Sequence, residues 1–174
     1  MSPVKGIYRP MNRFTVCLLA GVLPFALAAC ASAPPSQPGR AYSAVSETVA
    51  GDAADQALKL LGRPYRPGGS TPAAGFDCSG LVQFSFREAG LALPHNTDKQ
   101  RSVSRPVRLA DLRRGDLVFF DQEGKKSSHV GIYVGAGKFV HAPSSGKHVR
   151  SDRLDSPYWK KHLSGARRLS VFDA

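Results

Sequence analysis

A cysteine that stands where a helix should begin is the most reactive group that this sequence offers. Cys78 follows a glycine-flanked loop, and the residues after it place apolar side chains at helical spacing. Asp77 can cap this helix and Gly90 can end it. In the first turn of a helix, free backbone N–H groups and the positive end of the dipole stabilise a thiolate. We therefore predict a lowered pKa and a nucleophilic role for Cys78, against the commoner case of an inert, lone helical cysteine.

Two histidines lie on one predicted β-hairpin. His129 begins the first strand, His141 lies near the end of the second, and residues 135–137 form a three-residue loop between them. In that register His141 faces Gly131, and His129 is its diagonal neighbour on the same face of the sheet. Diagonal neighbours are about 7–8 Å apart at the backbone, which is within reach of two facing rings. The predicted register therefore brings the two imidazoles together, whereas a slip of one residue would separate them.

A thiol nucleophile needs an imidazole that takes up its proton, and that imidazole needs a third polar group that fixes its tautomer. These needs assign His129 as the base and His141 as the orienting group. Taken singly, each histidine could be an ordinary strand residue. A zinc site made of Cys78 and both histidines is a further alternative, although the short ligand spacings typical of zinc sites are absent. The remaining histidines are interpreted as surface residues: His95, His148 and His162.

Residues 1–29 have the composition of a secretory signal. Basic residues and no acid precede the apolar stretch 14–27, which is too short to span a bilayer comfortably. The true start could be Met11. The segment ends in Leu-Ala-Ala-Cys at Cys30, which resembles the bacterial lipobox, whose cysteine is lipid-modified and becomes the new amino terminus. With Ala31 next, this resemblance implies an outer-membrane lipoprotein that faces the periplasm. Ordinary cleavage to a soluble exported protein is the alternative.

Cysteine usage and charge both bear on the compartment. Cys17 would leave with the signal and Cys30 would carry lipid, so Cys78 would have no partner for a disulfide. An unpaired thiol is exposed to oxidation outside the cytoplasm, which makes a function for it more plausible. The net charge of +11 becomes +8 without the three basic residues of the signal. This surplus favours anionic partners such as cell wall or lipid headgroups, whereas nucleic-acid motifs are absent.

The order of the predicted elements indicates a single α+β domain. Residues 30–51, rich in Ala, Ser and Pro after Cys30, are predicted to form a flexible tether, and residues 52–174 the domain. Helices are expected from Asp52 to Leu61, from Cys78 and from Thr97, followed by an antiparallel sheet of about five or six strands. The strands are expected at 104–109, 117–120, 129–134, 138–142, 148–154 and 166–172, with a helical turn at 156–162.

Four stretches at compatible spacing resemble the NlpC family of bacterial cell-wall cysteine peptidases. They are FDCSGLV (76–82), RGDLVFF (114–120), HVGIYVG (129–135) and FVHA (139–142). The resemblance covers about residues 52–172 and implies a papain-like core with Cys78 as nucleophile, His129 as base and His141 as third member. It also implies hydrolysis of peptidoglycan amide bonds where diaminopimelate is linked to D-glutamate or D-alanine. No metal or organic cofactor is implied, and a monomer is expected.

The same resemblance implies that Tyr65 helps line the active site, and Asp77 and Ser79, on either side of the cysteine, are also predicted as substrate or oxyanion contacts. Two positions depart from the family pattern. Pro67 stands where an aromatic residue is frequent, and residues 94–97 read Pro-His-Asn-Thr where Pro-Arg-Thr or Pro-Arg-Ser is frequent. These departures bear on which bond is cut. A catalytically silent wall-binding module, or an acyltransferase or deamidase that uses the same thiol, are the alternative functions.

Overall fold

The computed structural model describes residues 42–122, 124–144 and 147–172. The predicted signal, the proposed lipid site Cys30 and most of the predicted tether lie outside these residues. The helices are α1 (Glu47–Lys59), α2 (Cys78–Glu88), α3 (Thr97–Ser102) and α4 (Pro157–His162), with a 3₁₀ turn at Leu109–Asp111. Within the described residues, no helix is long and apolar enough to cross a membrane.

The described strands form one large antiparallel sheet and a small two-stranded one. The seven-stranded sheet has the order β1-β9-β5-β6-β7-β8, and β4 pairs with β9 beside this path. Its strands are β1 (Tyr42–Ala44), β4 (Ser104–Val107), β5 (Leu117–Gln122), β6 (Lys125–Gly135), β7 (Lys138–His141), β8 (Arg150–Arg153) and β9 (Leu163–Phe172). The small sheet pairs β2 (Ser70–Thr71) with β3 (Gly75–Phe76) just before α2. The α+β prediction is confirmed, and β1 of the large sheet and both strands of the small sheet are additions to the six predicted strands.

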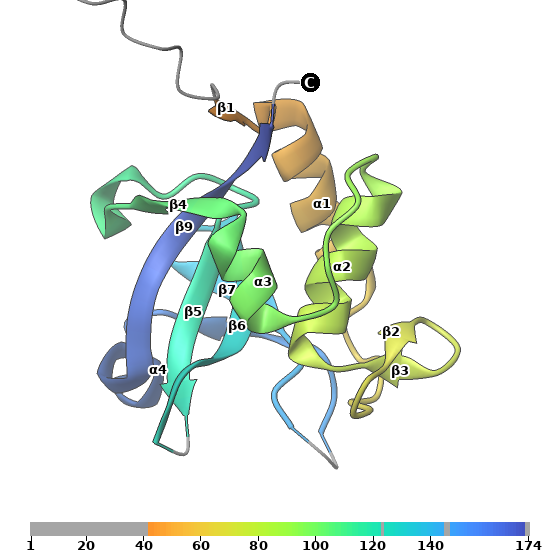
Figure 1. Cartoon of the computed structure of the whole chain (residues 1–174). Coiled ribbons are helices and arrows are strands. Elements are labelled where there is room, and N and C mark those ends of the chain that lie inside the picture. Colours follow the sequence, from red (N-terminus) through yellow and green to blue (C-terminus); the bar gives the residue numbers. More distant parts are fainter. Residues whose placement is uncertain (1–41, 123, 145–146, 173–174) are drawn as a thin grey trace, which may run out of the picture. The chain divides into compact units, whose positions relative to one another are not determined.

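Side chains that alternate along the central strands divide the core into two layers. Phe119 of β5 packs with α1 and α2 on one face of the sheet, where Figure 1 shows the two helices side by side. Its neighbours Val118 and Phe120 pack with Trp159 of α4 on the other face. The larger layer therefore positions the cysteine helix, and the smaller layer surrounds the histidine strands with aromatic rings.

The hairpin of β6 and β7 has the predicted register through most of its length. Ile132 pairs with Val140 and Tyr133 with Phe139, so Gly131 lies opposite His141. A Cβ at Gly131 would come 3.2 Å from the Cβ of His141 and 2.6 Å from the Phe139 ring, and only glycine leaves that room. The three-residue loop is wrong in detail, because a bulge near the turn pairs residue 135 with residue 138.

The predicted start of the first helix and the predicted end of the tether are wrong. Helix α1 begins at Glu47, because the Ser46 hydroxyl caps it by accepting a hydrogen bond from the N–H of Val49. Asp52, the predicted cap, lies exposed inside the helix. Leu61, the expected last residue of the helix, lies beyond the helix end with 44% of its surface exposed. The tether prediction fails from residue 42, since β1 pairs with β9.

Candidate active site

Cys78 is the first residue of α2, as the sequence predicted, and the Asp77 side chain holds the helix start in place. Asp77 Oδ1 accepts a hydrogen bond from the Gly80 N–H at 2.6 Å, and Oδ2 accepts one from the Gly68 N–H at 3.0 Å. A Cβ at Gly80 would meet the Gly69 carbonyl oxygen at 2.0 Å, so the loop before the cysteine lies directly on the first helical turn. The nucleophile position is therefore fixed by both the helix and the loop.

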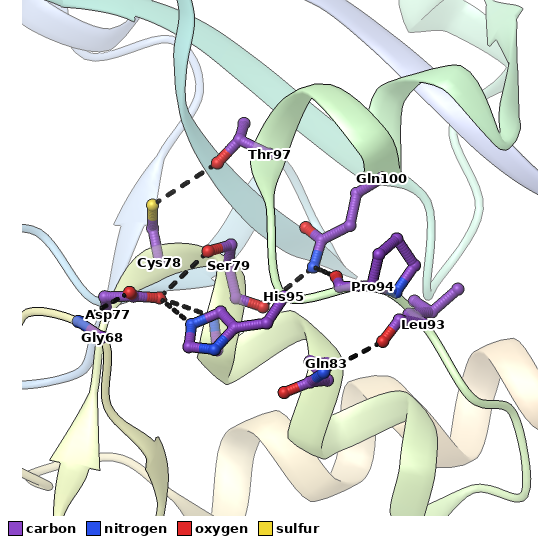
Figure 2. A network of polar contacts seen from close by, with 11 residues as sticks. Gly68, Asp77, Cys78, Ser79, Gln83, Leu93, Pro94, His95, Thr97 and Gln100 are labelled. Carbon is purple, nitrogen blue, oxygen red and sulfur yellow. Dashed lines mark hydrogen bonds and ion pairs between the residues drawn. The ribbon is translucent and has the colours of Figure 1, made fainter.

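The thiol lies in a half-buried position between α2, α3 and β6. Its Sγ is 4.0 Å from Thr97 Oγ1, a contact that Figure 2 shows from close by. The backbone N–H groups of Val130 and Ser79 also bond to the sulfur and lower its pKa. Val130 is the neighbour of His129, so the thiol lies against the strand that carries the proposed base.

The predicted low pKa of Cys78 is wrong for the free protein. Burial is the largest influence and raises the pKa of the thiol, and the charge of Asp77 raises it further. The stabilising N–H groups at the helix start are present, as expected, but they do not compensate for the loss of water. Cys78 is therefore a neutral thiol in the resting protein, which must lose its proton when it attacks.

The two predicted histidines are in direct contact. His129 Nε2 lies 2.8 Å from His141 Nδ1, and the rings are nearly perpendicular. His129 is 3% exposed and His141 is fully buried. Burial, followed by repulsion from His141 and Arg150, lowers the pKa of His129 to about 3, and burial also lowers the pKa of His141. Both imidazoles are therefore neutral at physiological pH.

An acidic residue that the sequence analysis did not single out completes this chain of contacts. Asp152 Oδ2 lies 3.0 Å from His141 Nε2. The same oxygen accepts a hydrogen bond from the Trp159 indole N–H at 2.8 Å and bonds from Arg150 at 2.8 and 3.0 Å. The hydrogen bond from His141, with those from Arg150 and Trp159, holds the pKa of Asp152 well below its usual range. Phe139 pairs with Asp152 across β7 and β8, which makes Asp152 a diagonal neighbour of His141.

The residues predicted to contact substrate lie close to the thiol. Tyr65 is half-buried, and burial, followed by the nearby Cys78 and Asp77, raises its pKa. Ser79 is buried and its hydroxyl donates to Asp77 Oδ1 at 3.1 Å. In the free protein, Asp77 and Ser79 therefore bond to each other and shape the helix start.

The prediction that His95 is a plain surface residue is wrong. Its Nε2 lies 2.9 Å from Asp77 Oδ1, and the ring is half-buried against the cysteine helix (Figure 2). His95 lies in one of the two places where the sequence departs from the family pattern, residues 94–97. His148 is exposed as predicted, and His162 is half-buried and bonds through Nδ1 to the Tyr158 carbonyl.

Two cavities lie beside these residues. One, of about 440 Å³, is lined near the thiol by Ser79, His95 and Thr97, and its charged lining residues are Lys125, Lys126, Asp77 and Asp98. The other, of about 170 Å³, lies beside Trp159 and is lined by these residues: Gln122, Pro143, Ser144, Lys147, Arg150 and Tyr158. A larger cavity of about 510 Å³ lies against α1 and contains none of the candidate catalytic residues among its lining residues. The first cavity therefore carries charges of both signs, and the second carries Lys147 and Arg150, of which Arg150 is paired with Asp152.

The contacts of the imidazoles do not fit the zinc alternative. His129 Nε2 and His141 Nδ1 bond to each other, and His141 Nε2 bonds to Asp152. Among the described residues, no group of three or more His, Cys, Asp or Glu side chains is arranged to hold a metal ion.

A thiol at a helix start, packed against a strand with a chain of imidazoles, defines the class of thiol hydrolases that use nucleophilic catalysis. The sequence comparisons narrow this class. The NlpC/P60 family profile matches residues 62–168, and the chain belongs to this family.

Several characterised proteins are similar to the chain. It is 47% identical over 116 residues to the murein DD-endopeptidase/LD-carboxypeptidase MepS of Escherichia coli K12, covering 66% of this chain and 60% of MepS. It is 45% identical over 116 residues to the muramidase/DL-endopeptidase CwlT of Bacillus subtilis 168, covering 66% of this chain and 35% of CwlT. A Staphylococcus aureus Mu50 structure, described as similar to lipoprotein of the NLP/P60 family, has 34% identity and a TM-score of 0.64, covering 75% of this chain and 44% of that one. The chain thus spans between about a third and three fifths of the length of these two curated relatives.

Proposed function

We propose that this protein is a peptidoglycan endopeptidase that hydrolyses amide bonds in stem peptides or in the cross-links between them. The observation that carries the proposal is the position of the Cys78 thiol at a helix start and next to β6. This strand carries His129, which is hydrogen-bonded to His141 of β7. Relatives named as murein DD-endopeptidase and as DL-endopeptidase support the substrate class. The bond would be the one that links diaminopimelate to D-glutamate or to D-alanine.

The proposed reaction has two stages. In the first, His129 takes the proton of the thiol while the Cys78 sulfur attacks the amide carbonyl carbon. The C–N bond then breaks, the leaving amine receives the proton from His129, and a thioester remains on the sulfur. In the second stage, His129 removes a proton from water, the hydroxide displaces the thiolate from the acyl carbon, and the proton returns to the sulfur. The backbone N–H of Cys78 is a candidate donor to the oxyanion in both stages.

Exposed lysines near the site are suited to the carboxylates of stem peptides. Such peptides carry carboxylates, and their binding is favoured by cations in a partly enclosed groove. Lys125 and Lys126 line the cavity beside the thiol together with Asp77 and Asp98, and Lys147 lines the cavity beside Trp159 together with Arg150, which is paired with Asp152. The carboxylates of a bound peptide would therefore be expected near these three lysines rather than near Asp77 and Asp98. Because the lysines are long and exposed, they would tolerate several stem-peptide sequences.

The test of this function uses defined muropeptides and the protein with Cys30→Ser, which cannot be lipid-modified. Monomers and cross-linked dimers are incubated separately and the products are weighed by mass spectrometry. Conversion of dimers to monomers identifies cleavage of cross-links, and shortening of monomers identifies cleavage within stems. The matched control adds Cys78→Ser, which keeps the shape of the site but removes the sulfur. Binding without any product, or full turnover by the serine variant, would refute the proposal.

We also propose that the protein is exported and anchored in the outer membrane through lipid on Cys30, with the domain as a monomer in the periplasm. The support lies in the apolar segment 14–27 followed by Leu-Ala-Ala-Cys, and in Ala31 after the cysteine. Metabolic labelling with a palmitate analogue should mark the wild-type chain and leave Cys30→Ala unmarked. Equal labelling of both chains, or recovery of the wild type in the soluble fraction, would refute the anchor.

A further inference from the structure

The carboxylate of Asp152 lies at the far end of the imidazole chain, and no other role is assigned to it. It accepts from His141 and from two side chains that can only donate, Arg150 and Trp159. These contacts keep Asp152 ionised, so its oxygen has no proton to give. The hydrogen in the contact with His141 must therefore belong to His141 Nε2.

Because both imidazole rings are neutral, the proton on His141 Nε2 also determines which nitrogen of His129 carries a proton. A neutral imidazole carries one proton, so His141 with a proton on Nε2 presents a lone pair at Nδ1. His129 Nε2, 2.8 Å away, must then donate. Since His129 is also neutral, its Nδ1 is left without a proton. That is the nitrogen which remains available for the thiol.

We propose that Asp152 is a positioning residue that sets the tautomer of His129 through His141, so that the free lone pair of His129 serves as the base toward Cys78. The inference deepens the proposed function and rests on it. Without an acceptor at position 152, the reverse arrangement satisfies the His129–His141 bond equally well. In that arrangement His141 Nδ1 donates to His129 Nε2, and the proton on His129 Nδ1 blocks the base.

Trp159 keeps this arrangement rigid. Its indole N–H donates to Asp152, its ring stacks on His129 with an angle of 22° and a centroid distance of 5.6 Å, and it meets His141 edge-on at 4.7 Å. One side chain of α4 thus contacts all three members of the chain. The charged groups that influence the two rings are Arg150 and Lys147, in addition to Asp152 itself.

The substitutions Asp152→Ala and Asp152→Asn separate the acceptor from the charge. Alanine removes the acceptor. Asparagine keeps one, because Trp159 and Arg150 can only donate and so hold the amide oxygen toward the three donors. The matched control is Asp155→Ala, since Asp155 is an exposed neighbour that pairs with Arg153 and contacts neither histidine.

The direct measurement is the long-range ¹H–¹⁵N spectrum of ¹⁵N-histidine-labelled protein, which identifies the protonated ring nitrogen without any substrate. The wild type, Asp152→Asn and Asp155→Ala should show His129 protonated at Nε2. Asp152→Ala should move a large part of that proton to Nδ1. An alanine variant that keeps the wild-type tautomer would overturn the inference. Because this readout needs no turnover, it decides the inference even if the muropeptide assay shows that the proposed function is wrong.

The kinetic measurement tests the consequence. Asp152→Ala should lose kcat by about 100-fold or more with little change in KM, because a wrong tautomer in a comparable triad costs about 10⁴-fold. Asp152→Asn should remain within about 10-fold of the wild type. If the alanine variant does not fold, Trp159→Phe, which keeps the ring but removes its N–H, should lower kcat and loosen the tautomer preference. An unchanged tautomer and kcat in Trp159→Phe would then count against the inference.

Discussion

His129 should make the folded protein sensitive to mild acid. Its pKa is lowered by burial to about 3, whereas an unfolded chain has a histidine pKa of about 6.5. Between these values the unfolded state binds a proton that the folded state does not bind. The stability that this group contributes is therefore present above pH 6.5 and is lost as the pH falls toward the folded pKa.

The expected loss of stability between pH 6.5 and pH 4.5 follows from the one proton that His129 binds in the unfolded state and not in the folded state. Since the unfolded histidine is half protonated at pH 6.5 and the slope approaches about 1.36 kcal/mol per pH unit below it, the free energy of unfolding should fall by about 2.3 kcal/mol over these two units. Asp152, whose pKa is lowered, adds little slope here because an unfolded aspartate, with a pKa of about 3.9, is mostly ionised across the window. His141, whose pKa is also lowered by burial, adds to the slope in the same direction.

Urea unfolding at a series of pH values measures this slope. The matched comparison is His129→Gln, which keeps a polar group of similar size that does not titrate. The variant should be less stable at pH 7, but its free energy of unfolding should fall less steeply between pH 6.5 and 4.5. The difference between the two slopes should correspond to about one proton bound on unfolding. If the two proteins lose stability in parallel over this window, His129 is not held neutral in the folded state and the base assignment loses its support.

Three further outcomes are expected. In thermal unfolding, Gly131→Ala should lower the free energy of unfolding by about 1–3 kcal/mol, because its Cβ would lie 2.6 Å from a buried ring. In the same assay Gly51→Ala, whose Cβ would point into open space beside α1, should leave this free energy unchanged or raise it by up to about 1 kcal/mol. Ser46→Ala should destabilise by about 1 kcal/mol through loss of the helix cap, and Asp52→Ala, inside the helix, should cost less; the reverse order would restore the start of the helix at residue 52. Alkylation of Cys78 by iodoacetamide should be slow at pH 7 and accelerate as the pH rises, because burial raises the pKa of the thiol; a rate that is already maximal at pH 7 would contradict this.

The hairpin that pairs the histidines could be predicted from the sequence because its information is local. A turn at 135–137 and the alternation of strand residues define the pairing of β6 with β7 within a few positions. The bulge near the turn was not predicted, and the register of Ile132 with Val140 is nevertheless the predicted one. The helix start at Cys78 was likewise local, since its cap Asp77 is the preceding residue.

Features that depend on distant segments could not be predicted in the same way. Strand β1 forms only against β9, some 130 residues away, and its composition gives no strand signal. Asp152 lies on a strand that was expected, but the connection between β7 and β8 is eight residues long, and turn residues in a connection of that length do not define which residue of β8 pairs with Phe139. The diagonal rule that paired the two histidines would have found Asp152 had that register been known.

The largest discrepancy, the pKa of Cys78, shows how burial changes the chemistry of this site. The helix start and the N–H groups of Val130 and Ser79 favour a thiolate, but removal of water disfavours every charged form. The same burial lowers the pKa of His129, so the thiolate–imidazolium pair is disfavoured from both sides. A neutral pair can react only if His129 presents a lone pair to the thiol, because no preformed thiolate carries the attack. The position of one proton on His129, and hence an acceptor at Asp152, then matters more than it would for an enzyme with a stable ion pair.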